Sequence, residues 1–567
     1  MTSTVDLDSS LRIRWLGRVR YRDALALQRQ LVAGEDDHLL LLEHDHVVTL
    51  SKRTPIEHLL VDVKSLGADV VAADRGGDIA YHGPGQLVGY PILTVAGKRG
   101  GGMADTAVYV ESIEQLLIDV LTDLGVDGGR IPRSTGVWVD VEGLRPRKIA
   151  AIGVRITRGR SMHGFALNVD PDLAWFDRIV PCGIRDKGVT SLAAEGVDIS
   201  MREVVDLVAA KAGDQWGRDR PVDRADVAWR VPVSDLAPFT RGEGVGTPVG
   251  RQGIGYGEQA DGTSVRLLGR LAEAGVAADP VRLKSRKPEW MRVPLDTGPK
   301  YREIKKTMRE LDLVTVCEEA GCPNISECWN DGTATFMILG ERCTRACGFC
   351  LVDTRKPVAA DPDEPARVAQ AVDRMALKHT VVTMVARDDL ADGGASAVAE
   401  TIHAIRAQVP ACRVEVLVSD FRGDDDSLQT VFDALPDVFN HNIETVARLQ
   451  RAVRPSAGYA RSLSVLARAK QAGLVTKSSI IVGMGETEEE VVQTMSDLAA
   501  SGVDIVTIGQ YLRPTSHHLP VAAWWEPKVF TRWKEQGEAM GIDHVESSPL
   551  TRSSYHAREA ADAAARP

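Results

Sequence analysis

Short apolar segments alternate with amphipathic segments from residue 335 to residue 511, and this rhythm limits the fold more than any other feature of the chain. The apolar segments are residues 335–340, 379–386, 412–419, 437–442, 478–484 and 504–511. Stretches with helical spacing lie between them, for example residues 395–409, 459–473 and 487–502. Strands that alternate with helices form a parallel sheet that is buried on both faces. The pattern therefore predicts an α/β fold of six βα units, an open or partial barrel with its chemistry at the carboxyl ends of the strands.

The first half of the chain has no such rhythm. Residues 21–35 and 105–129 have helical spacing and end at glycine. Segments of strand character occupy residues 38–51, 85–93, 135–141 and 148–157. Because the order of these elements is irregular, we expect an α+β sheet domain.

A glycine-rich segment separates the halves. Residues 241–265 contain eight glycines and little apolar periodicity, which is typical of a flexible linker or a long surface loop. A chain of 567 residues is also too long for one hydrophobic core. We expect one domain at residues 1–240, a glycine-rich linker at 241–278 and a second domain at 279–567.

Composition and charge indicate the compartment and exclude some partners. The N-terminus, MTSTVDLDSSLRIRW, has no cationic start, and no segment approaches the ~20 apolar residues of a membrane span. We therefore expect a cytoplasmic protein without a membrane partner, in which thiols stay reduced and clustered cysteines bind metal or catalyse. The net charge of −11 argues against nucleic acid as a partner. Residues 282–309 nevertheless carry ten Lys or Arg against three acids, as a solvated basic helix or as a docking patch for an acidic partner.

Six of the eight cysteines lie between residues 317 and 350. Cys317, Cys322 and Cys328 are spaced C-x4-C-x5-C, whereas Cys343, Cys347 and Cys350 are spaced C-x3-C-x2-C directly after the first predicted strand. Structural zinc usually takes four protein ligands, often as two CxxC pairs, and here Cys347 and Cys350 alone form such a pair. Three thiolates can instead hold three irons of a four-iron cluster and leave the fourth iron open to a ligand. Both a zinc site and a cluster stay open on spacing alone.

The second triplet and the six βα units resemble the radical S-adenosylmethionine (SAM) enzymes. The resemblance implies a [4Fe-4S] cluster on Cys343, Cys347 and Cys350, whose open iron binds the amino and carboxylate groups of SAM. It also implies an external reducing electron donor, since one electron cleaves SAM to a 5′-deoxyadenosyl radical.

The segment CEEAGCPNISECW before CTRACGFC, together with RSSYHA near the C-terminus, narrows the resemblance to lipoyl synthase over residues 280–560. The resemblance implies a second, auxiliary [4Fe-4S] cluster on Cys317, Cys322 and Cys328, with Ser554 as its fourth ligand. In that family the auxiliary cluster is consumed as the source of two sulfur atoms, which enter at C6 and C8 of a protein-bound octanoyl chain. Ser554 can act in this way if the C-terminal tail folds back over the mouth of the barrel; otherwise Ser553 and Ser554 form a polar turn.

Polar residues that follow other predicted strands are candidates for contacts with SAM. Gly393 and Gly394 come after the second strand, where the superfamily binds the SAM amine, although a plain helix-entry turn would look the same. Asn440, Asn442 and Glu444 follow the fourth strand and suit polar groups of SAM or substrate. Arg513 follows the sixth strand and suits a carboxylate. Each of these side chains also suits a purely structural role.

Cys182 is the single cysteine of the first half and lies in the loop sequence RIVPCGIRDKGVTS. A lone cysteine is usually a small buried apolar residue, as we expect for Cys412. Two upstream segments favour a catalytic role for Cys182. One is a glycine-rich loop, Arg75, Gly76, Gly77, Asp78, Ile79, Ala80, Tyr81 and His82, which can hold backbone close to a ligand. The other carries Lys148 at the start of an apolar strand.

These segments and HGFALNV at 163–169 resemble the octanoyl-carrier-protein:protein octanoyltransferases over residues 12–240. The resemblance implies a biotin and lipoate ligase fold, a thioester on Cys182 and Lys148 as its catalytic partner, because a nearby ammonium favours the thiolate. It also implies that the substrate contacts the loop of residues 75–82, Ala151, Ile152 and Gly153 on one strand, and Gly164, Phe165 and Ala166 on the next.

The combined resemblance implies a bifunctional enzyme of lipoate biosynthesis. Its expected partners are octanoyl acyl carrier protein and the lipoyl-carrier domains of 2-oxoacid dehydrogenase and glycine cleavage complexes. Two other interpretations stay open at this point. The first half could act only as a binding module for the acyl-carrier domain, or the whole chain could be a zinc-dependent structural protein.

Overall fold

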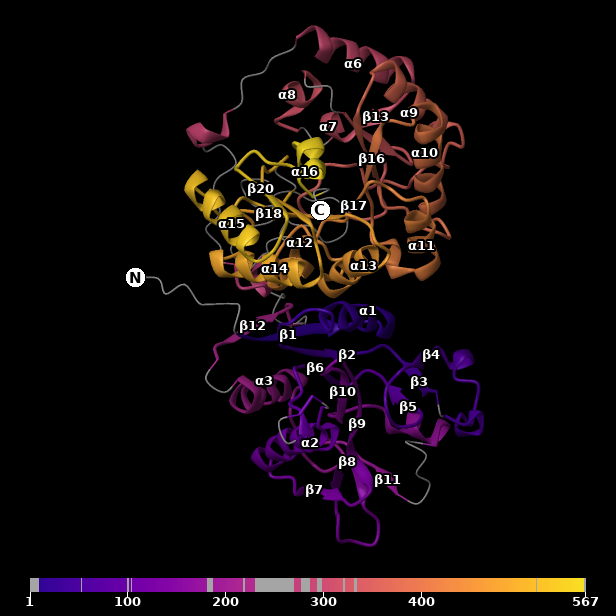
Figure 1. Ribbon diagram of the computed structural model, residues 1–567, viewed down its shortest axis with the longest axis vertical. Helices are drawn as coiled ribbons and strands as arrows, with labels where there is room; N and C mark the ends of the chain where they lie inside the picture. Colours follow the sequence, from indigo (N-terminus) through magenta and orange to yellow (C-terminus); the bar gives the residue numbers. More distant parts are fainter. Residues whose placement is uncertain are drawn as a thin grey trace, which may run out of the picture. The chain divides into compact units, whose positions relative to one another are not determined.

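The computed structural model describes residues 10–52, 54–98, 101–102, 104–180, 187–217, 220–229, 270–276, 286–292, 298–319, 322–330, 334–515 and 518–564. The chain divides into two compact units, Met1–Trp229 and Arg230–Pro567. Figure 1 shows the first in indigo to magenta and the second in pink to yellow. The predicted linker at 241–278 lies outside the described residues except for 270–276.

A mixed sheet forms the centre of the first unit. Along the described chain its strands are β1 (Leu11–Arg18), β2 (His38–Glu43), β6 (Gln86–Ile92), β7 (Gly128–Ile131), β8 (Ser134–Val139), β9 (Arg147–Thr157), β10 (Arg160–Asn168), β11 (Gly188–Val189) and β12 (Val222–Asp226). The strand order is β12-β1-β2-β6-β10-β9-β8-β7, with β11 paired to β9. A smaller sheet has the order β4-β3-β5 and consists of β3 (Val47–Ser51), β4 (Asp69–Ala73) and β5 (Ala80–His82).

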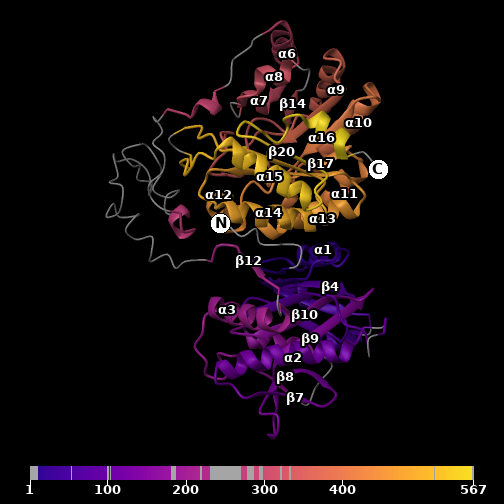
Figure 2. The ribbon, with the colours of Figure 1, turned by 60° about the vertical axis from the view of Figure 1, so that its left-hand side comes forward.

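Helices α2 (Thr106–Asp123) and α3 (Met201–Ala212) lie side by side against the main sheet (Figure 2). Helix α2 buries Ile113, Leu116, Leu117, Val120 and Leu121, which recur at helical spacing on one face. Each such side chain contributes about 1.5–3 kcal/mol when it is fully buried. The Asp105 carboxylate caps the helix by accepting a hydrogen bond from Val108 N. Helix α1 (Tyr21–Leu31) contacts β6 and β10.

The second unit contains the predicted βα units. Its strands are β13 (Val314–Thr315), β14 (Thr335–Ile338), β15 (His379–Met384), β16 (Arg413–Leu417), β17 (Val438–Asn440), β18 (Thr476–Val482), β19 (Ile505–Gln510) and β20 (His544–Ser547). Its helices are α6 (Pro299–Glu310), α7 (Val316–Glu319), α8 (Ile325–Asn330), α9 (Glu364–Arg374), α10 (Ala395–Gln408), α11 (Asp425–Asp433), α12 (Gln450–Val453), α13 (Tyr459–Gln471), α14 (Glu488–Ala500), α15 (Pro527–Ala539) and α16 (Ala557–Ala564).

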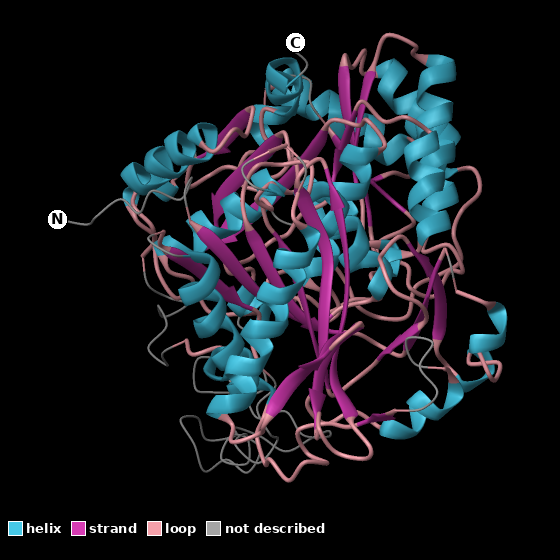
Figure 3. Ribbon diagram, turned by 60° about the horizontal axis from the view of Figure 1, so that its bottom comes forward, coloured by secondary structure: helices cyan, strands magenta, loops and turns pink. Residues whose placement is uncertain are grey.

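The strands of this unit pair in chain order from β13 to β20, and every pair from β14 onward is parallel. The helices between them run around the outside of the strands (Figures 1 and 3). The sheet is open, since β13 and β20 lie at its two ends. The predicted fold class, an α+β unit followed by an α/β partial barrel, is confirmed. The structure adds the antiparallel strand β13 and a seventh parallel strand, β20, to the six predicted strands.

Candidate active sites

Polar side chains of the second unit gather at the carboxyl ends of its parallel strands. The segment with Cys343, Cys347 and Cys350 directly follows β14. Gly393 and Gly394 follow β15, Asn442 and Glu444 follow β17, and Arg513 follows β19. Because parallel strands end at the same edge of the sheet, the fold brings these segments to one side of the barrel.

The three thiols of Cys343, Cys347 and Cys350 influence one another electrostatically. Burial, with smaller contributions from the Cys347 and Cys343 thiols, raises the pKa of the Cys350 thiol to about 12. Burial also raises the pKa of Cys347, partly offset by the positive charge of Arg454. The backbone fixes the segment, since Cys343 N donates to Asp353 O at 2.8 Å and Cys350 N donates to Cys347 O at 3.2 Å.

Asn442, Glu444 and Arg454 form a polar group near these thiols. Asn442 Nδ2 donates to Glu444 Oε1 at 3.0 Å, and Arg454 Nη1 donates to Asn442 O at 2.8 Å. Glu444 holds a positive φ of 66°, and burial raises the pKa of its carboxyl. Such strain in a residue other than glycine is common at functional sites. Asn442 Oδ1 is buried and has no hydrogen-bond partner in the described part of the chain, so it can accept a hydrogen bond from a ligand.

Gly393 and Gly394 form the entry to helix α10. Gly394 has φ +93°, and a Cβ atom there would lie 2.4 Å from Leu339 Cδ1, so the turn requires glycine. Gly394 N donates to Asp392 Oδ1 at 2.9 Å. Arg513 Nε donates to His518 O at 3.0 Å, and a ring nitrogen of His518 lies 2.9 Å from Cys350 O. Arg513 is thus linked to the cysteine segment through one residue.

The donor chemistry of the Cys343, Cys347 and Cys350 segment fits an iron–sulfur cluster. Three thiols are soft ligands of the type that such clusters take. Among the described residues, no group of three or more His, Cys, Asp or Glu side chains is arranged to hold a single metal ion.

The first triplet is held by two short helices. Cys317 is buried in α7, Cys328 lies in α8, and Cys322 lies between them. Cys322 N donates to Cys317 O at 3.0 Å, and Cys328 N donates to Asn324 O at 2.9 Å. Burial, with a smaller contribution from the Cys317 thiol, raises the pKa of the Cys322 thiol to about 11.

The C-terminal tail folds back against this triplet. Asn324 Nδ2 donates to Leu550 O at 2.7 Å, and the Tyr555 hydroxyl donates to Glu327 Oε1 at 3.1 Å. The positive charge of Arg552 also acts on the Cys322 thiol. Residues before and after Ser554 therefore contact the Cys322–Cys328 segment. A ligand role for Ser554 requires this proximity.

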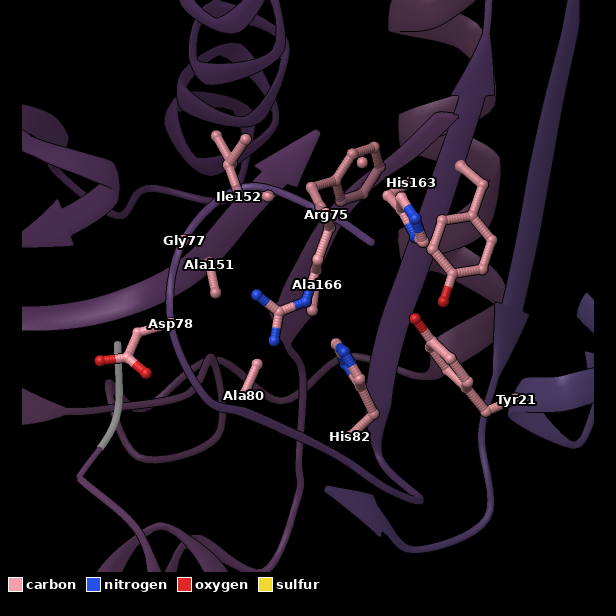
Figure 4. Close-up of a pocket in the computed structure, with 14 residues that line it drawn as sticks. Tyr21, Arg75, Gly77, Asp78, Ala80, His82, Ala151, Ile152, His163 and Ala166 are labelled. Carbon is pink, nitrogen blue, oxygen red and sulfur yellow. The ribbon is translucent and has the colours of Figure 1, made fainter. Parts of the chain in front are cut away.

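A pocket in the first unit lies between the glycine-rich loop, β5, and the β9–β10 hairpin (Figure 4). Eleven of the fourteen substrate-contact residues predicted from sequence line it: Arg75, Gly77, Asp78, Ala80, His82, Ala151, Ile152, Gly153, Gly164, Phe165 and Ala166. The hairpin brings its two halves together by pairing Ala151 with Ala166 and Gly153 with Gly164. A Cβ atom at Gly164 would lie 2.2 Å from Gly89 O, so glycine keeps β10 close to β6.

Gly76, Ile79 and Tyr81 are the three predicted contacts that do not line the pocket. Side chains alternate along a strand, so Ala80 and His82 face the pocket while Ile79 and Tyr81 face the other way. Ile79 and Tyr81 instead join an apolar cluster with Trp175, and Tyr81 stacks on the Trp175 ring at 5.3 Å. Gly76 contributes a backbone bond, from Gly76 N to Val154 O at 3.0 Å.

Tyr21, Tyr90 and His163 also line the pocket, and sequence reasoning missed them. His163 directly precedes the predicted Gly164, so its position in the motif was a usable signal. Its ring nitrogen Nε2 lies 2.9 Å from Asp74 Oδ1. Tyr21 comes from α1, more than fifty residues before the loop, and no local pattern connects the two.

Lys148 lies on β9, three residues before Ala151, and its side chain is buried. Its Nζ donates to Thr135 O at 3.2 Å and lies 4.7 Å from the centre of the Trp138 ring. Cys182 lies outside the described residues. The described residues on either side of it are fixed: Val180 N donates to His58 O at 2.8 Å, and Val189 pairs with Lys148 in the sheet. Cys412 is buried, as expected for a core residue.

Family models match both units. The lipoyl protein ligase A/B catalytic domain matches residues 20–213. The N-terminal domain of lipoyl synthase matches residues 276–322, and the radical SAM superfamily matches residues 337–498. None of the helices in the described residues has the length and apolar composition needed to cross a membrane.

Curated relatives match the second unit. Lipoyl synthase of Rubrobacter xylanophilus is 60% identical over 282 residues, which cover 49% of this chain and 88% of the relative. Lipoyl synthase of Halalkalibacterium halodurans is 55% identical over 277 residues, or 48% of this chain and 91% of the relative. A solved bipartite lipoate protein ligase from Thermoplasma acidophilum covers 38% of this chain and 87% of its own, with 19% identity and a TM-score of 0.33. Both lipoyl synthases are matched over most of their length at more than half identity. The chain therefore belongs to the lipoyl synthase family, and a lipoyl protein ligase A/B catalytic domain precedes its lipoyl synthase part.

Proposed function

We propose that the chain catalyses two consecutive steps of lipoate formation. The first unit transfers an octanoyl group from acyl carrier protein to a lysine of a lipoyl-carrier domain, and the second inserts sulfur at C6 and C8 of that octanoyl group. The observation that carries the first step is the pocket between the glycine-rich loop and the β9–β10 hairpin. Strand β9, which contributes to this pocket, also carries Lys148. Its lining includes Ala80, Ala151, Ile152, Phe165 and Ala166, an apolar set that suits an acyl chain.

The transfer proceeds through Cys182 in this proposal. The Cys182 thiolate attacks the octanoyl thioester, a new thioester bond to Cys182 forms, the bond between the octanoyl carbonyl and the carrier sulfur breaks, and the carrier leaves as its thiolate. The amine of the acceptor lysine then attacks the Cys182 thioester, an amide bond forms, and the Cys182 thiolate is released. Lys148 is the group proposed to take the proton from the attacking amine. Val189 lies seven residues after Cys182 in the sequence and pairs with Lys148 in the sheet. This pairing supports a joint role for Cys182 and Lys148.

The second step assigns the two cysteine triplets to two [4Fe-4S] clusters. Cys343, Cys347 and Cys350 would hold the SAM-binding cluster, and Cys317, Cys322 and Cys328 with Ser554 would hold the auxiliary cluster. When bound, the first supplies one-electron cleavage of SAM and the second supplies sulfur. Gly393, Gly394, Asn442 and Arg513 are proposed to position SAM through backbone and side-chain polar atoms. A low-potential one-electron donor is required as a partner.

The proposed acceptors are the lipoyl-carrier domains of 2-oxoacid dehydrogenase and glycine cleavage complexes. An octanoylated carrier released by the first unit starts at a high effective concentration for the second, because both belong to one chain. The fusion therefore favours consecutive use of both sites on one carrier.

The test of the first step is covalent capture. The full chain is incubated with octanoyl acyl carrier protein without acceptor and its mass is measured. The wild type and the Cys412→Ser control should gain one octanoyl group, whereas Cys182→Ser should lose thioester turnover by orders of magnitude. Binding of the carrier without an octanoyl adduct on the wild type would instead favour a first unit that acts as a binding module. Transfer at the wild-type rate by Cys182→Ala would exclude the thioester.

A further inference from the structure

Arg345 lies between the first two cysteines of the C-x3-C-x2-C segment, and its side chain is only 6% exposed. The guanidinium forms a two-pronged pair with Asp388, from Nε to Oδ2 and from Nη2 to Oδ1, both at 2.8 Å. Nη2 also donates to Asp420 Oδ1 at 2.6 Å. Asp388 follows β15 and Asp420 follows β16, so one side chain joins the cysteine segment to the ends of two neighbouring strands.

Asp420 has no exposed surface, and its charge depends on arginine. Burial is the largest single influence and would raise the pKa of its carboxyl, but the charge and hydrogen bond of Arg345, together with the charge of Arg461, outweigh burial and lower the pKa to about 2. Arg461 adds a second positive charge, with Nη1 3.6 Å from Asp420 Oδ2. A buried charge that loses its partner is strongly destabilising. The arrangement therefore holds Arg345 in one place.

Thr344 and the backbone extend this attachment to Cys343. Thr344 N and Thr344 Oγ1 both donate to Ala386 O at 2.9 Å, and Asp388 N donates to Thr344 Oγ1 at 3.1 Å. Arg345 N lies 3.4 Å from Cys343 Sγ, as a donor to the sulfur. The side of the segment that carries Cys343 is thus fixed to β15 and β16 through Thr344 and Arg345.

The other side of the segment is fixed differently. Gly348 N donates to Val453 O at 2.8 Å, and Leu519 N donates to Gly348 O at 2.8 Å. These are backbone bonds on the opposite flank of the segment, near Cys347 and Cys350. The Cys343 side has backbone bonds as well, and the buried side-chain contacts of Arg345 add to them a direct link to Asp388 and Asp420.

We propose that Arg345 is a positioning residue: its fork to Asp388 and Asp420 sets the place of the Cys343 sulfur before a cluster is bound. This inference rests on the ligand assignment proposed above for Cys343, Cys347 and Cys350. Residues that orient metal ligands typically change metal affinity about 10–100-fold when they are altered. Lysine keeps the charge of Arg345 but cannot form the planar two-pronged pair.

The test measures cluster assembly in the full chain with Cys317, Cys322 and Cys328 replaced by alanine, so that bound iron reports one cluster. Arg345→Lys should bind iron with an affinity about 10–100-fold lower at limiting iron and sulfide. Because its charge is kept, the midpoint potential of the loaded fraction should match the parent. Arg345→Gln should also lose affinity and show a more negative potential, since a nearby positive charge is gone while Asp388 and Asp420 remain. Asp388→Asn, which keeps the Asp420 contact, covers the case in which Arg345→Gln does not fold.

Arg468→Gln is the matched control. Arg468 Nη1 donates to Gly423 O at 3.2 Å and to Asp425 Oδ1 at 2.6 Å, so it fixes the segment after β16 at a different point. Its iron affinity and potential should equal those of the parent. Parent-like iron affinity in Arg345→Lys, Arg345→Gln and Asp388→Asn overturns the proposal, as does an equal loss in Arg468→Gln. Cys347→Ala tests the ligand assignment separately from the role of Arg345. If the Cys347→Ala variant also keeps its iron, the ligand assignment itself is wrong, and not the role of Arg345 alone.

Discussion

The two cysteine triplets are held by different parts of the fold. Cys343, Cys347 and Cys350 lie on a segment that is bonded to Asp388 and Asp420, which follow two parallel strands, and to Val453 at the end of helix α12. Cys317 and Cys328 lie on the short helices α7 and α8, which follow the antiparallel edge strand β13, Cys322 lies between the two helices, and the C-terminal tail contacts this segment. One triplet is part of the barrel edge, whereas the other is closed by a segment more than 200 residues away in the sequence.

This difference matches the two proposed tasks. A cluster that repeatedly exchanges one electron benefits from fixed ligands, because each change of ligand position changes its potential. A cluster that is consumed must release its atoms, and the stretch between β20 and α16, which meets the triplet through hydrogen bonds of Leu550 and Tyr555, can open at a smaller cost than a strand end. The contacts of the two triplets therefore predict different responses to mutation.

The largest effect is expected for the barrel triplet. Cys343→Ala, Cys347→Ala or Cys350→Ala should abolish reductive cleavage of SAM, measured as 5′-deoxyadenosine, because each removes one of three iron ligands. Octanoyl transfer should stay at the wild-type rate, since it belongs to the other unit and distant sites behave independently. Continued formation of 5′-deoxyadenosine by all three variants would contradict the assignment.

The next effect separates the triplets. Replacement of Cys317, Cys322 or Cys328 by alanine should leave 5′-deoxyadenosine formation intact and stop lipoyl formation. Iron analysis should show that about half of the iron is lost, as expected when one of two equal clusters is missing. Loss of SAM cleavage in these variants, with the other cluster still loaded, would mean that the two triplets do not work separately.

Sequence patterns predicted the barrel because it depends on local periodicity and chain order. The six strands were predicted from apolar runs, and residues directly after parallel strands must meet at one edge. The segment from Arg75 to His82 was recognised as a unit, yet strand alternation turns Ile79 and Tyr81 away from the pocket. That orientation depends on which face of β5 packs against the Trp175 cluster, and tertiary packing decides this.

Residues that reach a site from distant elements were not predictable in this way. Tyr21 on α1 and Tyr90 on β6 reach the pocket through the packing of the unit and not through any motif. Asp388 and Asp420 follow parallel strands, as Gly393 does, so chain order places them at the same edge of the sheet. Their contact with Arg345, however, depends on side-chain geometry. The attachment of the tail through Asn324 and Tyr555 likewise joins segments that are far apart in the sequence.

Ser554 sharpens the comparison further. Ser554→Ala should still form 5′-deoxyadenosine but make little or no lipoyl product, because the auxiliary cluster lacks its fourth ligand. Ser554→Cys should also cleave SAM and fail to make product, for the opposite reason: a thiolate is the softer and stronger iron ligand and should hold the cluster intact. Normal lipoyl yield from Ser554→Ala, with both clusters present by iron count, would falsify the ligand role of Ser554 and leave the cysteine assignments in place.

The smallest effect is expected for the attachment of the tail itself. Tyr555→Phe removes the hydrogen bond to Glu327 and keeps the ring, which stacks on His556 with centroids 3.8 Å apart. A single exposed hydrogen bond contributes about 0.5–1.5 kcal/mol, so tail closure should weaken by roughly 2- to 12-fold. Hydrogen exchange at residues 550–555 should become faster by that factor, and lipoyl yield should fall only slightly. Asn324→Ala, which removes the part-buried bond to Leu550 O, should increase exchange more than Tyr555→Phe does, since this bond is less exposed to water than the Tyr555 bond. If neither change affects exchange in the tail while both lower iron at the first triplet, the two residues act on α8 and not on the closure of the tail.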